Sequence, residues 1–311
     1  MSDHPAVVDC LIVGGGPSGL TAALYLKRFR RSVLVIDSGE SRASWIPTSH
    51  NIPFFSHGIS GDEILARERE HAALYDVVAE TARVTDVQKS EGGFLATVES
   101  ADGATRKVAA RRVVLATGAV DIEPDLPDVP DAVRRGLVRY CPICDGYEAI
   151  GKRVAVIARG NHGVGEAIFI RRTYSDDVTL LTLGEQLDLE PGQAEDLQEK
   201  GVTIVADPIV ALDHKGDAIG AMRTAQQELR FDILYSALGL HYRSELALAL
   251  GARHDERKAL WVDEHCQTSV KGLYAIGDVV IGLDQIVVGM GQAAFAATHI
   301  HNRCEYPTED E

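Results

Sequence analysis

Apolar residues along this chain concentrate in short runs that are separated by glycine-rich or polar turns. Residues 7–13 (VVDCLIV) predict a buried parallel strand, because an uninterrupted apolar run is typical of a strand covered on both faces. A glycine-rich turn follows at 14–19, then a helical stretch at 20–29 and a second strand at 33–37. The order of strand, turn, helix and strand predicts a βαβ unit near the start of the chain.

A second βαβ unit is predicted further along. Its strand at 154–158 leads into a glycine-containing turn at 159–163, a helix at 166–173 and a strand at 178–183. Other strands are expected at 94–99, 105–109, 113–118, 202–205, 231–236 and 273–278, and other helices at 64–75 and 288–303. Residues 121–130 are rich in Pro and Asp and predict a linker. The pattern indicates an α/β protein with two Rossmann-like, three-layer βαβ domains.

Composition and charge exclude several classes of function. The 311 residues carry a formal net charge of −15, which argues against binding to nucleic acid or to anionic membranes. No apolar run reaches the length of a membrane span, and the first residues show no secretion signal. Five cysteines, an odd number, fit a reducing compartment, so a cytoplasmic protein is expected.

The first glycine turn has the spacing of a dinucleotide-binding loop. Gly14 permits a tight turn, Gly16 lets the backbone approach a pyrophosphate, and Gly19 lets the helix pack closely on the strand. The helix start then offers N–H groups to phosphates, and Asp37 stands where a carboxylate accepts hydrogen bonds from a ribose. A structural turn without a ligand is the alternative. The later strand that ends in Gly277-Asp278 adds a carboxylate for a ribityl hydroxyl, which favours FAD.

Cys141 and Cys144 form the one close cysteine pair, in the sequence Cys141-Pro142-Ile143-Cys144. A zinc site would need a second pair of ligands at suitable spacing, and no such pair is present in the sequence, so no metal site is predicted. Two core cysteines without chemistry are a second alternative. A redox dithiol is favoured, in which one thiolate attacks a disulfide and the other resolves the mixed disulfide. Asp145 is a candidate proton carrier, although an Asp-Gly turn explains it equally well.

Together these motifs resemble the low-molecular-weight thioredoxin reductases of the pyridine nucleotide–disulfide oxidoreductase superfamily. The resemblance rests on GGGPSG at 14–19, ATG at 116–118, CPICDG at 141–146 and AIGD at 275–278. It implies an FAD-binding domain made of residues 1–120 and 241–311, with a nucleotide-type domain at 121–240 that carries the dithiol. Family members are usually homodimers, which is therefore expected here.

The resemblance also assigns roles to individual residues. Cys141 would face the substrate, Cys144 would lie near the flavin, and Asp145 would be the acid. Asp278 would hold the ribityl chain, and Asn51 and Gln285 would line the isoalloxazine ring. The full set of expected FAD-binding residues is Gly14, Gly16, Pro17, Ser18, Gly19, Asp37, Asn51, Thr117, Gly118, Gly277, Asp278 and Gln285.

The second glycine turn departs from the pattern of the family, which would bind NADPH there. Ala158 replaces the first glycine, and Thr182-Leu183-Gly184-Glu185 stands where NADPH-dependent members carry a His-Arg-Arg run. Between 174 and 199 there are eight acidic residues and no Lys or Arg, so a phosphate dianion would be repelled. The sequence argues against NADPH as donor, unless basic residues from another segment reach this place.

Four functions remain open from the sequence. A thioredoxin reductase-like enzyme would reduce a protein disulfide of a thioredoxin-like partner with electrons from ferredoxin or flavodoxin. The sequence also resembles the dithiol oxidases of the gliotoxin and holomycin type, which close a small-molecule disulfide and pass electrons to oxygen. The shared feature is an aromatic residue followed by Glu, here Tyr147-Glu148, but those oxidases carry His where this chain has Asp145. A conventional NAD(P)H-dependent thioredoxin reductase is the third function, and a flavin-binding redox sensor is the fourth. Arginines at 28, 30 and 31 or at 134, 135 and 139 are candidate docking patches for an acidic donor, or ordinary surface residues.

Overall fold

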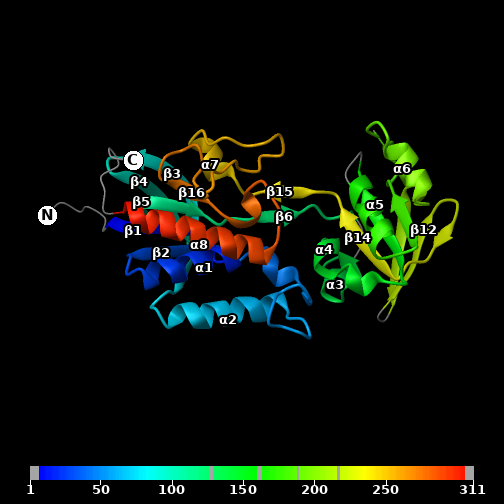
Figure 1. The fold of residues 1–311 in the computed structure, drawn as a ribbon, viewed down its shortest axis with the longest axis horizontal. Helices are drawn as coiled ribbons and strands as arrows, with labels where there is room; N and C mark the ends of the chain where they lie inside the picture. The colour runs from blue at the N-terminus through cyan, green and yellow to red at the C-terminus, as the bar shows by residue number, and fades with distance from the viewer. Residues whose placement is uncertain (1–6, 126–128, 160–162, 188, 216–217, 305–311) are drawn as a thin grey trace. The chain divides into compact units, whose positions relative to one another are not determined.

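The computed structural model describes residues 7–304 except 126–128, 160–162, 188 and 216–217 (Figure 1). The chain divides into two compact units. Unit 1 comprises Met1–Ser44, Gly61–Val120 and His241–Glu311, and unit 2 comprises Trp45–Ser60 and Asp121–Leu240. The chain passes between them in two short strands, β6 (Ala119–Asp121) and β15 (Leu240–Tyr242), which pair with each other.

The sheet of unit 1 has six strands in the order β1-β2-β3-β4-β5-β16, with β1 also paired to β5. The strands are β1 (Val7–Val13), β2 (Val33–Asp37), β3 (Ala79–Ser90), β4 (Gly93–Ser100), β5 (Thr105–Leu115) and β16 (Leu273–Ala275). β1 runs parallel to β2 and to the end of β5, whereas β3, β4 and the beginning of β5 form an antiparallel meander. One long β5 therefore replaces the separate strands predicted at 105–109 and 113–118, and that prediction is wrong.

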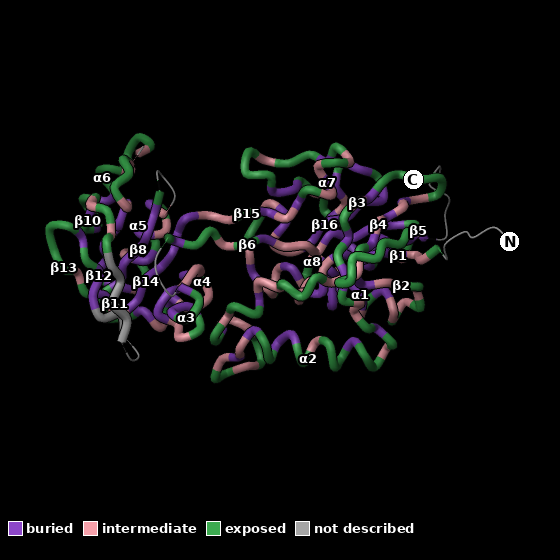
Figure 2. The backbone as a smooth tube through the Cα atoms, turned by 180° about the vertical axis from the view of Figure 1, so that it is seen from behind, coloured by how far each residue is buried: buried purple, intermediate pink, exposed green. Residues whose placement is uncertain are grey.

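Both faces of the unit 1 sheet are buried along the second half of β1. Leu11 and Val13 of β1 lie in one apolar cluster, and Cys10 and Ile12 lie in another on the opposite face. This alternation explains why β1 reads as an unbroken apolar run. The helices are α1 (Pro17–Arg28), α2 (Gly61–Ala73), α7 (Glu245–Ala249) and α8 (Ile286–Arg303), with single turns η1 (Arg42–Trp45) and η3 (Gly277–Val279). α1 and α8 run side by side, as Figures 1 and 2 show from opposite directions.

Arginines from β5 and from the loop before β2 bind the last carbonyl groups of α8. Arg112 is 2% exposed and donates to the Arg303 carbonyl at 3.2 Å. Arg111 donates to the Cys304 carbonyl at 3.0 Å, and Arg31 donates to the His301 carbonyl at 2.7 Å. Cations at a helix C-terminus satisfy its free carbonyls and its partial negative charge. Arg31, a candidate for a docking patch from the sequence, is thus engaged in holding the fold.

Unit 2 is built on a five-stranded parallel sheet in the order β10-β9-β8-β14-β7. These strands are β7 (Val138–Arg139), β8 (Arg153–Ala158), β9 (Asp177–Leu181), β10 (Thr203–Val205) and β14 (Ile233–Ala237). A separate three-stranded sheet consists of β11 (Ile209–Lys215), β12 (Ala218–Thr224) and β13 (Glu228–Leu229). The helices are α3 (Val129–Arg134), α4 (Pro142–Asp145), α5 (Val164–Thr173) and α6 (Gln193–Glu199), with the single turn η2 (Tyr147–Ala149). The predicted α/β class with two Rossmann-like units is confirmed.

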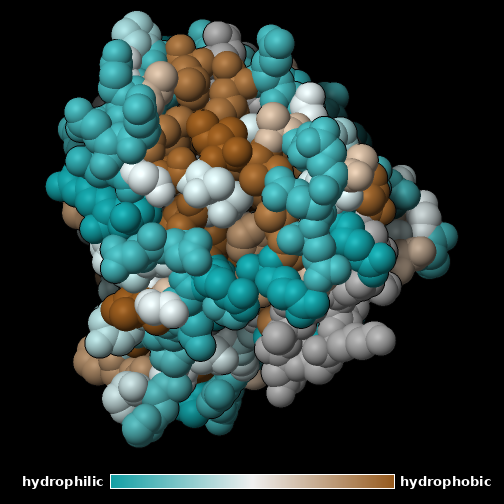
Figure 3. All heavy atoms as spheres, turned by 90° about the vertical axis from the view of Figure 1, so that its right-hand side faces the viewer, coloured by the Kyte–Doolittle hydropathy of each residue, from teal (hydrophilic) through white to brown (hydrophobic). Residues whose placement is uncertain are grey.

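Figure 3 views unit 2 from the end that bears α6 and shows an apolar area bordered by hydrophilic residues. Exposed apolar side chains of this unit include Phe169 of α5 and Ile204 of β10, which are 38% and 45% exposed. Within the part of the chain that the structure describes, no helix is both long and apolar enough to cross a membrane.

Candidate functional site

The two cysteines of unit 2 are joined in a disulfide. Cys141 is the residue that caps α4, and its Cα atom lies 5.3 Å from that of Cys144. The Cys144 N–H group donates to the Cys141 carbonyl at 3.0 Å and lies 3.2 Å from the Cys141 Sγ atom. Pro142 begins the helix, which suits its fixed φ and missing N–H group. A single helical turn therefore sets the two cysteines at a separation that a disulfide can bridge.

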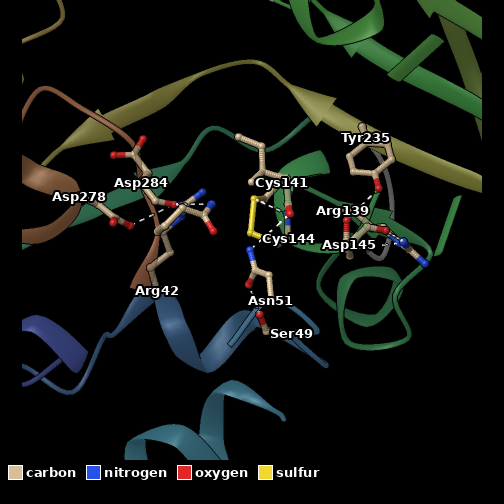
Figure 4. Close-up of a disulfide and its surroundings, with 12 residues drawn as sticks. Arg42, Ser49, Asn51, Arg139, Cys141, Cys144, Asp145, Tyr235, Asp278 and Asp284 are labelled. Carbon is tan, nitrogen blue, oxygen red and sulfur yellow. Dashed lines mark hydrogen bonds and ion pairs between the residues drawn. A yellow bond between two sulfur atoms is a disulfide. The ribbon is translucent and has the colours of Figure 1, made fainter. Parts of the chain in front are cut away.

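Asp145 ends the same turn, and its side chain is directed towards Tyr235 and Arg139 (Figure 4). The Tyr235 hydroxyl donates to Oδ1 at 2.8 Å, and the Arg139 Nε atom lies 3.7 Å from Oδ2. Arg139 also donates to the Asp145 carbonyl at 2.8 Å. Burial raises the pKa of Asp145 above its ordinary value, although Arg139 and the Tyr235 hydrogen bond act in the opposite direction. Sequence reasoning found Asp145 but missed Arg139 and Tyr235.

Asn51 lies beside the disulfide turn, from the segment of unit 2 that precedes α2. Its amide donates to the Ile143 carbonyl at 3.3 Å, and Ser49 donates to its side-chain oxygen at 2.9 Å (Figure 4). Asn51 thereby fixes the backbone between the two cysteines. Its expected place at an isoalloxazine ring stays a prediction.

The first glycine turn of unit 1 has no room for a side chain at Gly14 or at Gly19. Gly14 has a φ of +110°, and a Cβ atom built there would lie 2.2 Å from the Ala116 carbonyl oxygen. A Cβ atom on Gly19 would lie 2.0 Å from the Gly14 carbonyl oxygen. α1 begins after Gly16 with no side-chain cap, so its first N–H groups remain available for an anionic ligand. Pro17 and Ser18 form its first turn.

Two carboxylates of unit 1 border this turn. A Cβ atom on Gly15 would lie 2.7 Å from the Asp37 carboxyl carbon, so Asp37 lies directly against the loop. The Asp278 carboxylate, in η3, accepts a hydrogen bond from the Arg42 guanidinium at 3.0 Å, so the two form an ion pair (Figure 4). A Cβ atom on Gly277 would lie 2.6 Å from the Ser18 hydroxyl, which brings η3 against the start of α1.

Three further side chains complete this region. The Gln292 side-chain oxygen accepts from the Gly277 N–H group at 2.7 Å. Thr117 donates to the Arg243 carbonyl at 2.6 Å, and the Gly118 carbonyl accepts from the Arg243 N–H group at 3.0 Å. Gln285 is buried at the cap of α8. Arg42 and Gln292 were missed from the sequence, because an isolated Arg or Gln gives no pattern until the fold brings it to the loop.

These features of unit 1 fit a flavin dinucleotide. The tight glycine turn and uncapped helix start suit a pyrophosphate, and carboxylates at the ends of two strands suit sugar hydroxyls. Across the described ranges, no group of three or more His, Cys, Asp or Glu side chains is arranged to hold a metal ion.

The corresponding turn of unit 2 is built differently. Ala158 remains in β8, paired with Ala237 of β14, whereas Gly14 has left its strand. A Cβ atom on Gly163 would lie 2.8 Å from the Ala158 Cβ atom, so the methyl group of Ala158 takes up space beside the start of α5. Residues 160–162 lie outside the described residues.

Arg159 occupies the place that Gly15 has in unit 1. Its Nε atom lies 3.3 Å from the Glu185 carboxylate, so an ion pair stands where unit 1 has a bare glycine next to Asp37. A second acid of the stretch, Asp176, pairs with Arg171 at 2.9 Å. Arg159 and Arg171 therefore reach the acidic stretch from outside it, but each is already paired with a carboxylate of that stretch. Asp188, another acid of the stretch, lies outside the described residues.

Comparison with known proteins identifies the family. Residues 8–297 match the family described as pyridine nucleotide-disulphide oxidoreductase. The chain is 31% identical over 306 residues to a subunit of alkyl hydroperoxide reductase from Pseudomonas putida, a match that covers 93% of this chain but only 56% of that protein. It is 26% identical over 310 residues to the thioredoxin reductase of Bacillus subtilis, covering 96% and 95% of the two chains.

The crystal structure of HlmI superposes with a TM-score of 0.84 at 28% identity, covering 96% of this chain and 93% of that one. The matched family is flavin-dependent. Because the family match spans nearly the whole chain and includes both cysteines, this protein belongs to the pyridine nucleotide-disulphide oxidoreductases and is a thioredoxin reductase-like enzyme with a Cys141–Cys144 disulfide.

Proposed function

We propose that this protein is an FAD-dependent disulfide oxidoreductase that uses a donor other than NADPH. Electrons pass between the flavin and a substrate disulfide through Cys141 and Cys144. The observation that carries the donor assignment is the Arg159–Glu185 ion pair at 3.3 Å in the turn that would receive the nucleotide. The Arg159 guanidinium, the cation nearest to this turn that could contact a phosphate of the nucleotide, is already paired with a carboxylate.

FAD is assigned to residues 1–120 and 241–311, and the dithiol to the inserted residues 121–240. The start of α1 would hold the pyrophosphate, Asp37 a ribose, and Asp278 with Arg42 the ribityl region. Thr117, Gly118 and Gln285 belong to the same site. When bound, the flavin supplies a carrier that accepts or donates two electrons.

The dithiol then acts on its substrate by thiol–disulfide exchange. The Cys141 thiolate attacks a sulfur of the substrate disulfide, which forms a mixed disulfide and releases one substrate thiolate. The Cys144 thiolate attacks Cys141 in turn, which restores the Cys141–Cys144 disulfide and releases the second substrate thiolate. Each leaving thiolate takes up a proton, so the protein gives up the two protons of its dithiol. Asp145 is the group assigned to carry a proton in these steps.

A thioredoxin-like protein is the substrate proposed, because relatives of this chain include thioredoxin reductases. The donor proposed is a one-electron carrier such as ferredoxin or flavodoxin. Arg139 binds Asp145, and Arg31 binds the end of α8. Because both side chains are held in internal contacts, they are not part of the proposed donor-binding patch. A homodimer in the cytoplasm completes the proposal.

A dithiol oxidase is the second candidate. The Tyr147-Glu148 pair favours it, and Tyr147 is 75% exposed beside the disulfide turn. Asp145 counts against it, since an imidazole titrating near neutral pH is better suited to thiol oxidation.

Anaerobic mixing tests the proposal. Reduced ferredoxin should bleach the flavin absorbance of the holoenzyme, and an oxidised thioredoxin should restore it. NADPH and NADH at millimolar concentration should leave the spectrum unchanged over the same time. Rapid bleaching by NADPH would contradict the donor assignment, and oxygen-dependent turnover of a small dithiol would favour the oxidase.

A further inference from the structure

The exchange steps move two protons from the dithiol to two substrate thiolates, and Asp145 can carry one of them. Its carboxylate is engaged at both oxygens, since Oδ1 accepts from the Tyr235 hydroxyl at 2.8 Å and Oδ2 lies 3.7 Å from the Arg139 Nε atom. A carboxylate held between two such partners has little freedom to follow a proton to a substrate sulfur. A second acid–base group beside the disulfide would therefore have a task.

A second carboxylate lies one turn beyond the disulfide. α4 runs on into η2, because Gly146 between them has the right-handed helical φ of −69° and ψ of −24°. Residues four apart on such a turn share a face, which places Glu148 on the face of Cys144. The Glu148 Oε2 atom is buried and has no hydrogen-bond partner within the described part of the chain. Its Oε1 atom lies 3.9 Å from the His50 Nδ1 atom, within the range of an ion pair once the imidazole is protonated.

His50 is held at this place by the residues on either side of it. Ser49 and Ile59 exchange both backbone hydrogen bonds, at 2.8 and 3.0 Å, which closes a short loop. Asn51 donates to the carbonyl of Ile143, between the two cysteines, at 3.3 Å. Figure 4 shows Ser49 and Asn51 beside the disulfide. The loop that carries His50 is therefore attached to the disulfide turn.

The imidazole ring of His50 is fixed on one side and open to solvent on another. A Cβ atom on Gly58 would lie 2.9 Å from the His50 Cε1 atom and 3.0 Å from Nδ1, so the ring packs on the backbone across the loop. The His50 side chain is nonetheless 39% exposed, and its Nε2 atom has no partner among the described residues. Imidazoles change charge between about pH 5 and 8, so they both give and take protons near neutral pH.

We propose that His50 is a catalytic residue that gives a proton to the departing substrate thiolate, with Glu148 as the positioning residue for its ring. As the Cys141 thiolate forms the mixed disulfide, the protonated imidazole transfers its Nε2 proton to the substrate sulfur that leaves. The neutral imidazole then takes the proton of the Cys144 thiol. The resulting thiolate attacks Cys141 and releases the second substrate thiolate, which takes the proton held by Asp145.

Both protons thus come from the dithiol, and the imidazole ends in the charge state in which it began. This inference rests on the proposed dithiol function and adds the group that carries the second proton.

The test compares two disulfides whose leaving thiols differ in their need for a proton. Holoenzyme is reduced with dithiothreitol, freed of the reagent under anaerobic conditions, and mixed at about pH 7 with dithiobis(nitrobenzoate) or with bis(hydroxyethyl) disulfide. Acid quenching, alkylation and mass spectrometry give the rate at which Cys141 and Cys144 are reoxidised. An aromatic thiolate is a weak base and leaves without a proton, whereas an aliphatic thiolate is a stronger base and leaves better when protonated.

His50→Gln should slow the aliphatic reaction about tenfold to a hundredfold and the aromatic reaction by less than about threefold. Glu148→Gln should show the same selective effect to a smaller degree. His241→Gln is the matched control, because His241 of unit 1 is also exposed and lies 3.4 Å from a glutamate, Glu245; it should reproduce the wild-type rates. Equal slowing of both reactions in His50→Gln, or slowing of neither, would overturn the proposal.

A second measurement uses the wild type alone and covers the case of a poorly folded variant. Over a series of disulfides with increasingly basic leaving thiols, the wild-type rates should fall less steeply than those of dithiothreitol, and an equally steep fall would overturn the proposal. Wild-type protein that reacts with neither disulfide would contradict the proposed function itself, and this inference with it.

Discussion

Replacing Tyr235 by phenylalanine should destabilise the protein in a pH-dependent manner, because it removes one hydroxyl and leaves the ring in place. Tyr235 is fully buried in β14, and its hydroxyl donates to the Asp145 carboxylate at 2.8 Å. A hydrogen bond to a charged group contributes about 1.5–3 kcal/mol, whereas one between neutral groups contributes about 0.5–1.5 kcal/mol. The loss should therefore depend on whether Asp145 is ionised.

The direction with pH follows from the pKa of Asp145. Burial raises this pKa above its unfolded value, so protonated Asp145 favours the folded state and this contribution is lost as pH rises through the folded pKa. Tyr235 opposes that loss by stabilising the carboxylate. Tyr235→Phe should thus raise the pKa of Asp145 further and lower stability more at pH 8 than at pH 4, because the ionised fraction of Asp145 rises with pH.

Thermal unfolding of the variant and wild type at about pH 4 and pH 8 measures this difference. A loss of about 2 kcal/mol at pH 8 corresponds to a melting temperature roughly 4–8 °C lower, and the decrease at acidic pH should be less than half of that. Tyr147→Phe, at a 75% exposed position, is the control and should change stability by no more than about 0.5 kcal/mol at either pH. Equal decreases at both pH values would refute the role given to the Tyr235–Asp145 hydrogen bond.

Three other substitutions have defined outcomes. Gly14→Ala should abolish flavin retention on purification and lower the melting temperature, because its Cβ atom would lie 2.2 Å from the Ala116 carbonyl oxygen at a φ of +110°. Asn51→Ala should slow reoxidation of the reduced dithiol by a substrate disulfide about threefold to tenfold without loss of fold, since it removes one hydrogen bond to the Ile143 carbonyl. Arg159→Gly should change stability by less than about 1 kcal/mol in thermal unfolding, because the pair with Glu185 is exposed, and NADPH should still fail to bleach the flavin.

The elements predicted best from the sequence are the strands that are buried on both faces. The strands expected at 7–13 and 33–37 have the bounds of β1 and β2, because a strand buried on both faces shows an unbroken apolar run. β3 was missed, since buried positions such as Val84 and Val87 are separated by exposed polar residues in a long meander strand. β11, β12 and β13 were also missed.

In the candidate site, too, the residues of a local motif were predictable from the sequence, whereas residues brought in from distant segments were not. A local motif revealed Cys141, Cys144 and Asp145, which lie within one turn. Tyr235 comes from β14, far along the chain from that turn, and a single sequence carries no signal of such a long-range contact. The charge pattern that argued against NADPH was visible in the sequence, but the pairing of Arg159 with Glu185 became apparent only in the folded chain.

Anaerobic reductive titration of the holoenzyme tests the central claim most directly, namely that flavin and disulfide exchange electrons within one protein. Wild-type protein and Cys144→Ser are titrated with dithionite while the flavin absorbance is recorded. The wild type should consume two electrons more than Cys144→Ser before the flavin is fully reduced, because a disulfide takes up two electrons. Identical titration curves would show that the Cys141–Cys144 pair does not exchange electrons with the flavin and would contradict the proposed function.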